Sequence, residues 1–203
     1  RMAIVMIVSI YISRIVLVQL GETDYGVYNV VGGVVGMIMS FNSALSFGTQ
    51  RFVSYYTGEG NLDLLSKVFS SAFLIHCVLA LFIAFVLETI GLWFVNNVLN
   101  IPPDRLVAAT IVLHISVATS FFAILQLPFS AFIIAHERMN IYAYVSLIDV
   151  GIKLLLAYSI SVVPCDKLVF YALMLAFAQI IQACIYMIYC RRKFSECHIV
   201  LHK

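Results

Sequence analysis

Long apolar stretches separated by short polar breaks dominate the chain. Six such stretches can be read at residues 2–20, 27–50, 68–95, 106–134, 141–163 and 168–190. A helix needs about 20 apolar residues to cross the roughly 30 Å hydrocarbon core of a bilayer, and each stretch meets that length. The breaks carry turn-forming residues, as in Gly58-Glu59-Gly60-Asn61 and Pro102-Pro103-Asp104, and are too short to be domains. The pattern predicts a single transmembrane domain of six spans over residues 1–203.

The composition is typical of a membrane protein. The continuous apolar runs favour transmembrane helices over the strands of a membrane barrel. Of the 203 residues 63% are hydrophobic and 11% are charged, whereas soluble domains carry about 25% charged residues. Barrel strands would alternate apolar and polar positions, and these runs do not alternate. Helices satisfy their own backbone hydrogen bonds in lipid. We therefore predict an all-α integral membrane bundle.

The charges exclude one function class and predict an orientation. A net charge of +2 gives no basic field that could hold nucleic acid. If six spans place the breaks on alternating sides, one side carries most of the Lys and Arg: Arg1, Arg51, Lys67, Arg138, Arg191, Arg192, Lys193 and Lys203. The other side carries Arg105 and Lys167. The positive-inside rule then predicts that both ends lie in the cytoplasm.

Two cations lie inside predicted spans, where an ionisable group costs about 2.5–3.5 kcal/mol. Arg14 either reaches outward to the interface or lines a cavity. Lys153 lies near the middle of its span, and Asp149 lies four residues earlier on the same helical face, in the order that suits an ion pair. The pair either neutralises itself within the bundle or lines a hydrated path that receives an anionic group.

Further polar groups inside the spans are candidates for proton transfer, cavity lining or movement. Glu88, His76 and His114 are possible proton-linked groups. The alternatives are that Glu88 reaches the membrane interface or caps a helix, and that the histidines form hydrogen-bonded helix contacts. The amide of Gln126 can bridge helices or line a cavity. Pro128 should bend or break its helix, which suits either a hinge or a static kink.

Catalytic and cofactor chemistry has no visible motif. The five cysteines form no C-x-x-C pair, so we expect neither a metal site nor a disulfide framework. No nucleophile–base–acid set, phosphate loop or H-E-x-x-H motif is present. We expect no enzymatic activity and no cofactor.

Three blocks near the predicted span ends resemble a known family. They are Leu20-Gly21-Glu22-Thr23-Asp24-Tyr25-Gly26-Val27-Tyr28-Asn29, then Ser46-Phe47-Gly48-Thr49-Gln50-Arg51-Phe52 with Gly58-Glu59-Gly60-Asn61, then Pro128-Phe129 through Ala135-His136-Glu137-Arg138-Met139-Asn140. In this order and between these spans, the blocks are similar to those of polysaccharide flippases in the MATE-like (MOP) exporter superfamily. The resemblance covers nearly the whole chain.

The resemblance implies a bacterial inner-membrane transporter that flips lipid-linked oligosaccharide, such as O-antigen or capsule units on a polyprenyl pyrophosphate. Such transporters have two six-helix lobes around a central cavity, and this chain would supply the N-terminal lobe, with the C-terminal lobe missing. Arg14 and Lys153 are then the candidate cavity cations, and Asp149 would tune Lys153. Arg51, Glu59, Glu137 and Arg138 are expected to anchor cytoplasmic loops.

Three alternatives remain open at this point. A cation-coupled multidrug exporter of the same superfamily would place a carboxylate in its first-lobe cavity, and Asp149, beside a lysine, is the mid-membrane acid available. A membrane-embedded polyprenyl-phosphate transferase would need clustered acids or a His–Asp set at one membrane face. A non-transporting scaffold could use the same fold to bind partners.

Overall fold

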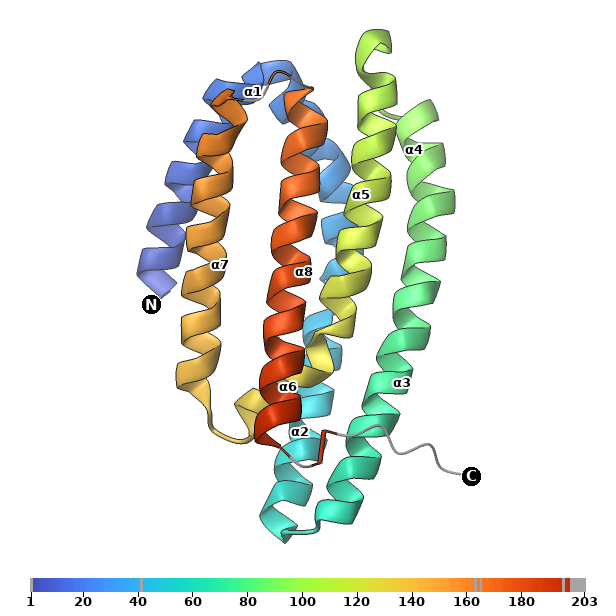
Figure 1. Cartoon of the computed structure of the whole chain (residues 1–203). Helices are drawn as coiled ribbons and strands as arrows, with labels where there is room; N and C mark the ends of the chain where they lie inside the picture. The colour runs from blue at the N-terminus through green and yellow to red at the C-terminus, as the bar shows by residue number, and fades with distance from the viewer. Residues whose placement is uncertain (1, 41, 163, 165, 195, 198–203) are drawn as a thin grey trace.

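The apolar stretches form helices, since a backbone in lipid must satisfy its own hydrogen bonds. The computed structural model describes residues 2–40, 42–162, 164, 166–194 and 196–197, and across these residues the chain is a bundle of helices without strands (Figure 1). The predicted all-α membrane bundle is confirmed. Parts of the sequence predictions that concern Arg1, Val163, Cys165 and Lys203 lie outside the described residues.

The helical elements succeed one another with short connections. They are α1 (Met2–Met39), α2 (Asn42–Glu59), α3 (Leu62–Val86), the π-helical turn η1 (Leu87–Gly91), α4 (Leu92–Asn97), the 3-10 turn η2 (Pro103–Arg105), α5 (Leu106–Leu125), α6 (Leu127–Ala135), α7 (Met139–Ser159), the 3-10 turn η3 (Ile160–Val162) and α8 (Lys167–Lys193). Within the described part of the chain, five stretches are long and apolar enough to cross a membrane: Ala3–Met37, Leu62–Asn97, Pro103–Ala135, Met139–Ser159 and Lys167–Lys193. Six spans were predicted from the sequence.

The difference lies in α1, which a kink at Gly21 divides. At 1.5 Å per residue, a straight helix of this length would extend about 57 Å, nearly twice the hydrocarbon core. Gly21 has φ 84° and ψ 169°, a backbone conformation that essentially only glycine adopts. Figure 1 shows α1 rising from the N-terminus, turning at the top and descending behind α8. The turn falls between the first two predicted spans, and the second arm leads into α2, which is more polar than the other long helices.

The helix break predicted at Pro128 is present. α5 ends at Leu125, Gln126 forms a turn and α6 begins at Leu127, so Pro128 lies in the first turn of α6. A proline there loses no intrahelical hydrogen bond, because its position has no partner for an N–H group.

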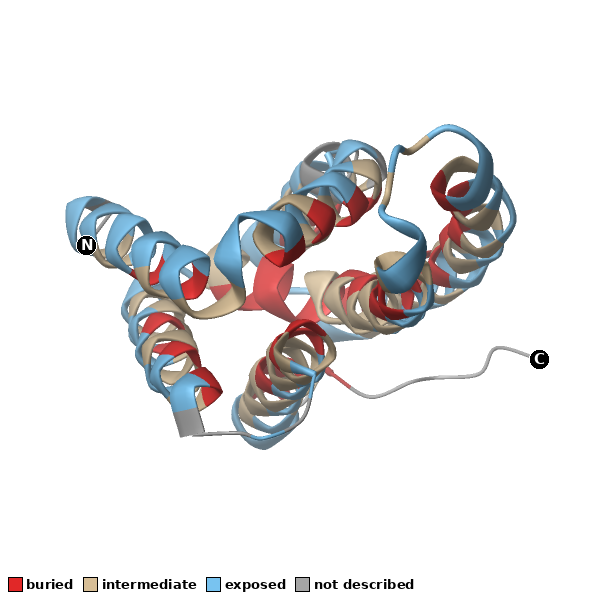
Figure 2. Ribbon diagram, turned by 90° about the horizontal axis from the view of Figure 1, so that it is seen from above, coloured by how far each residue is buried: buried red, intermediate tan, exposed pale blue. Residues whose placement is uncertain are grey.

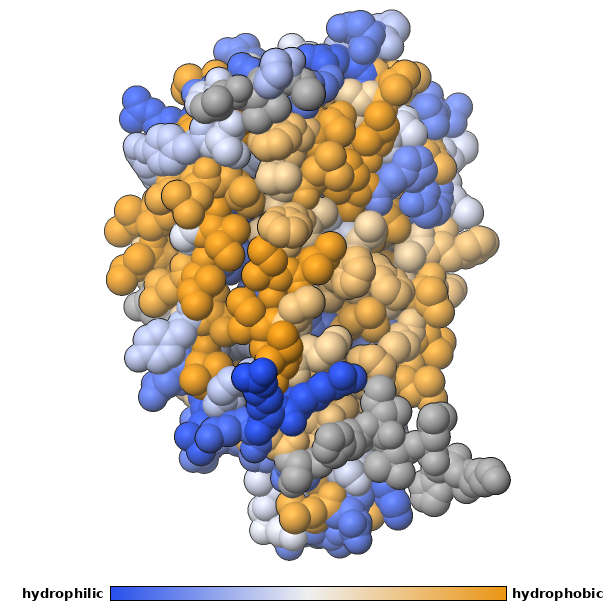
Figure 3. Space-filling view, viewed as in Figure 1, coloured by the Kyte–Doolittle hydropathy of each residue, from blue (hydrophilic) through white to orange (hydrophobic). Residues whose placement is uncertain are grey.

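Buried residues lie on the sides of the helices that face one another (Figure 2). Their side chains pack in three clusters. The largest joins α1, α3 and α5 around Val31 and Leu113. A second joins α2, α3, α6, α7 and α8 around Phe69 and Phe132, and a third joins the first arm of α1 to α7 and α8. The face of the bundle seen in Figure 3 is mainly apolar between its two ends and carries hydrophilic side chains at both ends, as expected of a bundle surrounded by lipid.

Candidate functional site

A cavity of about 420 Å³ lies between the second arm of α1, α5, α7 and α8. Its polar lining consists of Tyr28, Ser116, Thr119, Ser120, Lys153, Tyr171 and Gln179. Gly32 and Gly36 line the α1 side, where the absence of side chains leaves room. The cavity therefore combines an apolar frame with one cation, one amide and several hydroxyl groups.

Lys153 and Asp149 form the predicted ion pair, with 2.7 Å between Nζ and Oδ2. The two partners are not equally accessible, since 37% of the Lys153 side chain is exposed and 13% of that of Asp149. Lys153 lines the cavity, whereas Asp149 lies beside a small void between α7 and α8. An ammonium group carries three donors, so two remain after the bond to Asp149. The ammonium of Lys153 is therefore accessible from the cavity, whereas Asp149 does not line it.

Gln126, a predicted cavity residue, is not among the residues that line the cavity, but its amide binds the amide of Gln179. Gln179 lines the cavity, and its Nε2 donates to Oε1 of Gln126 at 3.1 Å, which links α8 to the α5–α6 break. The hydroxyls of Thr119 and Ser120 donate to backbone carbonyls one turn earlier. Their oxygens can still accept hydrogen bonds from a molecule in the cavity.

The structure separates Arg14 from Lys153. Arg14 is exposed and lies in another hollow, of about 350 Å³, with Tyr11 and Tyr158, whose hydroxyls are 2.8 Å apart. Arg14 therefore does not line the cavity that holds Lys153. It lies at a different surface of the bundle, between the first arm of α1 and the end of α7.

Two of the three predicted proton-linked residues, Glu88 and His114, are in contact. His114 on α5 lies with Nδ1 2.8 Å from Oε2 of Glu88, which belongs to the π-helical turn η1. Both side chains face outward, 49% and 37% exposed. The third candidate, His76, is buried in α3 away from them, and its Nδ1 contacts the carbonyl oxygen of Ala72 at 2.7 Å.

The four predicted loop anchors are exposed at the end of the bundle that carries Gly60, which we call the Gly60 end. Arg51 and Glu59 belong to α2, and a hydrogen bond to Glu59 raises the pKa of Tyr55. Glu137 and Arg138 form the turn between α6 and α7, where Glu137 has φ 59°.

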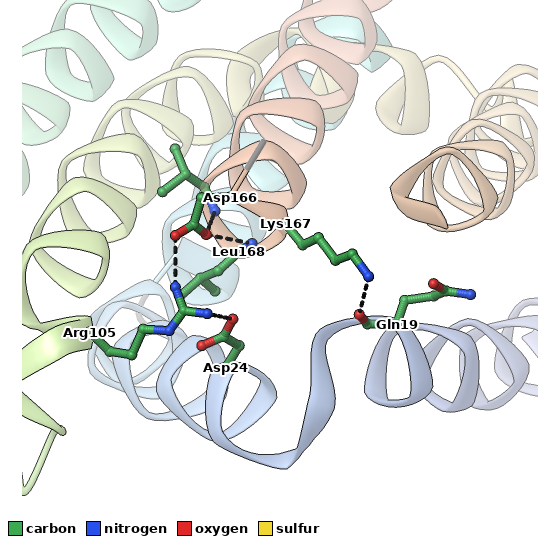
Figure 4. Close-up of polar contacts among 7 residues, drawn as sticks. Gln19, Asp24, Arg105, Asp166, Lys167 and Leu168 are labelled. Atoms are coloured by element: carbon green, nitrogen blue, oxygen red, sulfur yellow. Dashed lines mark hydrogen bonds and ion pairs between the residues drawn. The ribbon is translucent and has the colours of Figure 1, made fainter. Parts of the chain in front are cut away.

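A three-residue ion-pair network at the opposite end, here the Gly21 end, was not foreseen from the sequence. Arg105 donates to Asp24 at 2.7 Å and to Asp166 at 2.8 Å, and so joins η2 to α1 and α8 (Figure 4). Asp166 also caps α8 by accepting from the backbone N–H of Leu168 at 3.0 Å. Lys167 donates to the carbonyl oxygen of Gln19 at 3.2 Å. Only the cap could have been recognised from sequence, because an Asp precedes the apolar run.

The described residues contain no group of three or more His, Cys, Asp or Glu side chains that could hold a metal ion. The arrangement can instead offer hydrogen bonds and one positive charge to a molecule inside an apolar frame.

Comparison with known protein families identifies the family of the chain. A model of the MatE family matches residues 2–159, which include α1 to α7 and the Lys153–Asp149 pair. No curated protein and no solved structure matches the chain.

Proposed function

The chain belongs to the MatE family of membrane transporters, and on that premise we propose that it supplies one lobe of a flippase for lipid-linked oligosaccharides. The observation that carries the proposal is the Lys153 ammonium in the cavity, with two donors free for an anion. A polyprenyl pyrophosphate presents such an anion at the point where lipid and sugar join.

The rest of the lining suits a sugar on an apolar carrier. Hydroxyl and amide groups of Tyr28, Thr119 and Gln179 exchange hydrogen bonds with sugar hydroxyls, while the apolar frame accepts the adjoining lipid. Cations in a hydrated cavity lower the cost of moving an anionic head through the bilayer.

A cation-coupled multidrug exporter is the second candidate from this family. Such an exporter would need an accessible carboxylate, and among the described residues that line the cavity there is no Asp or Glu. Asp149 does not line the cavity, and its Oδ2 is bound to Lys153. These contacts favour the flippase.

Transport in this account needs a second lobe, because one lobe leaves the cavity open on one side. We propose that a C-terminal lobe of the same protein closes it in the bacterial inner membrane. In the proposed orientation, the Gly60 end lies in the cytoplasm, since it carries Arg51, Lys67, Arg138 and Arg191–Lys193.

The test expresses the full-length protein in two bacterial strains, one lacking its polysaccharide flippase and one lacking its drug exporters. Restored surface polysaccharide without a gain in drug tolerance supports the proposal. Drug tolerance without polysaccharide supports the exporter instead.

A further inference from the structure

The hollow beside Arg14, of about 350 Å³, lies on the surface of the bundle and shares no residue with the cavity that holds Lys153. Its lining residues are Tyr11, Arg14, Ile15, Val18, Gln19 and Tyr158. Arg14 lies seven residues before the kink at Gly21, or about 10 Å along the helix. A long arginine side chain at that depth can extend to the interface, where lipid headgroups lie.

The polar groups of the hollow can donate hydrogen bonds to a bound anion. Arg14 is exposed, and within the described part of the chain it forms no ion pair, so its five N–H donors remain available. The hydroxyls of Tyr11 and Tyr158, both about half exposed, lie 2.8 Å apart. One hydroxyl donates to the other, so the second keeps its proton for another acceptor. A cation without a partner inside an apolar span is costly, and an anion in the hollow would lower that cost.

Apolar side chains continue from the hollow toward the Gly60 end. Ile7 lies one turn before Tyr11 on the same face of α1, and Leu155 lies one turn before Tyr158 on the same face of α7. Both are exposed. The first arm of α1 and α7 lie side by side and both run toward the Gly21 end (Figure 1). Because the two tyrosine hydroxyls are in contact, the apolar side chains below them belong to the same surface, which suits a lipid with its head at Arg14.

We propose that this hollow binds the phosphodiester group of an anionic glycerophospholipid in the leaflet at the Gly21 end. The guanidinium of Arg14 binds the phosphate oxygens, and the free hydroxyl proton of the tyrosine pair donates to the same phosphate. The acyl chains lie against Ile7 and Leu155. A water-soluble phosphate would leave these apolar side chains uncovered, and a zwitterionic lipid would bring its ammonium group close to the charge of Arg14.

Two phospholipids that differ in headgroup charge test the proposal. Phosphatidylglycerol is anionic, and phosphatidylethanolamine with the same acyl chains is zwitterionic. Native mass spectrometry of the full-length protein in nonionic detergent, with both lipids at equal concentration, should show about fivefold preference for phosphatidylglycerol, the ratio that one cation contributes near a membrane surface. Arg14→Gln should remove the preference, whereas Arg14→Lys should retain it because the charge remains.

Three further variants separate the role of the charge from that of the hydroxyls. The double change Tyr11→Phe with Tyr158→Phe should weaken both lipids by the same factor, because both carry the phosphate that the free hydroxyl contacts. Ser13→Ala, next to Arg14 but outside the hollow, should change the binding of neither lipid. Thermal unfolding identifies any variant that fails to fold, and the preference of the unsubstituted protein tests the proposal without them.

Equal binding of the two lipids to the unsubstituted protein, or a preference that survives Arg14→Gln, would overturn the proposal. So would equal affinity for glycerophosphoglycerol, which is the same headgroup without acyl chains. Tighter binding of a polyprenyl phosphate through Arg14 would assign the hollow to the transported lipid and would also overturn it. None of these measurements follows transport, so a failure here leaves the flippase proposal standing.

Discussion

The guanidinium of Arg105 lies 2.7 Å from the carboxylate of Asp24, although 81 residues separate the two along the chain. The Asp24 side chain is 6% exposed and that of Arg105 is 33% exposed. The same guanidinium binds Asp166, so one side chain ties the segment after the Gly21 kink to the beginnings of α5 and α8. This contact holds the Gly21 end of the cavity-forming helices together.

Replacing Arg105 with Ala should lower the free energy of unfolding by about 2–3 kcal/mol. The change leaves the Asp24 carboxylate buried without a counter-charge, which is strongly destabilising, and the partial exposure of Arg105 reduces the effect. Chemical unfolding in detergent, followed by circular dichroism, measures it.

Two variants serve as controls for Arg105→Ala. Asp166→Asn keeps the cap of α8 and removes a more exposed charge, so it should cost less than about 1 kcal/mol. The double change Asp24→Asn with Arg105→Gln should cost less than Arg105→Ala, since the only carboxylate left without its partner is the more exposed one of Asp166. Equal losses for Arg105→Ala and Asp166→Asn would show that Asp24 does not depend on Arg105.

Gly21→Ala should destabilise the chain by about 1–3 kcal/mol, because the kink requires a backbone conformation that alanine resists. Apart from the adjoining backbone of α1, no atom lies within 4 Å of the added methyl, so the loss would come from the backbone conformation and not from a clash. Gly26→Ala is the matched control: Gly26 lies in the helical part of α1 with equally open space, and Ala there should be neutral or stabilising. Similar losses at both positions would contradict this account of the kink.

Most of the fold could be predicted from the sequence because lipid imposes it. Apolar run length alone indicated the helices, and the i, i+4 spacing indicated the Asp149–Lys153 pair, since both are local properties. The break beside Pro128 followed from the missing N–H group. The break between the first two predicted spans was also located correctly, but local pattern did not show that the helix continues across it with a kink at Gly21.

Contacts between distant segments could not be predicted, since nothing in a single sequence says which helices become neighbours. The Arg105–Asp24 and Glu88–His114 pairs join residues far apart along the chain. The sequence position of Arg14 indicated how deep it lies in its span. Which surface of the bundle its side chain reaches depends on how α1 packs, and a single sequence does not show that.

Glu137→Gly should raise the free energy of unfolding by about 1 kcal/mol. Glu137 has φ 59°, a left-handed conformation that strains any residue with a Cβ atom and suits glycine. Arg138→Gly is the matched control at the next position, where φ is −84° and glycine only adds freedom to the unfolded chain. Thermal unfolding in detergent should move in opposite directions for the two variants, and a shared direction would exclude strain at Glu137.

The Glu88–His114 pair should act as one unit in transport. Because Oε2 of Glu88 lies 2.8 Å from Nδ1 of His114, Glu88→Gln and His114→Gln each break the same contact. In the full-length protein the two variants should lower flipping to the same level, and the double variant should lower it no further. Additive losses would mean that the residues act separately and would remove the basis for a shared proton-linked role.

The most direct test of the central claim is flipping of lipid-linked oligosaccharide by the full-length protein with Lys153→Ala. This variant should fail to restore surface polysaccharide in a flippase-deficient strain at normal protein levels, because the cavity loses the ammonium proposed to receive the anionic head. Lys153→Arg should retain part of the activity, and Arg51→Ala, a change at the exposed Gly60 end, should retain it fully. Full activity of Lys153→Ala would contradict the claim that this cation receives the substrate.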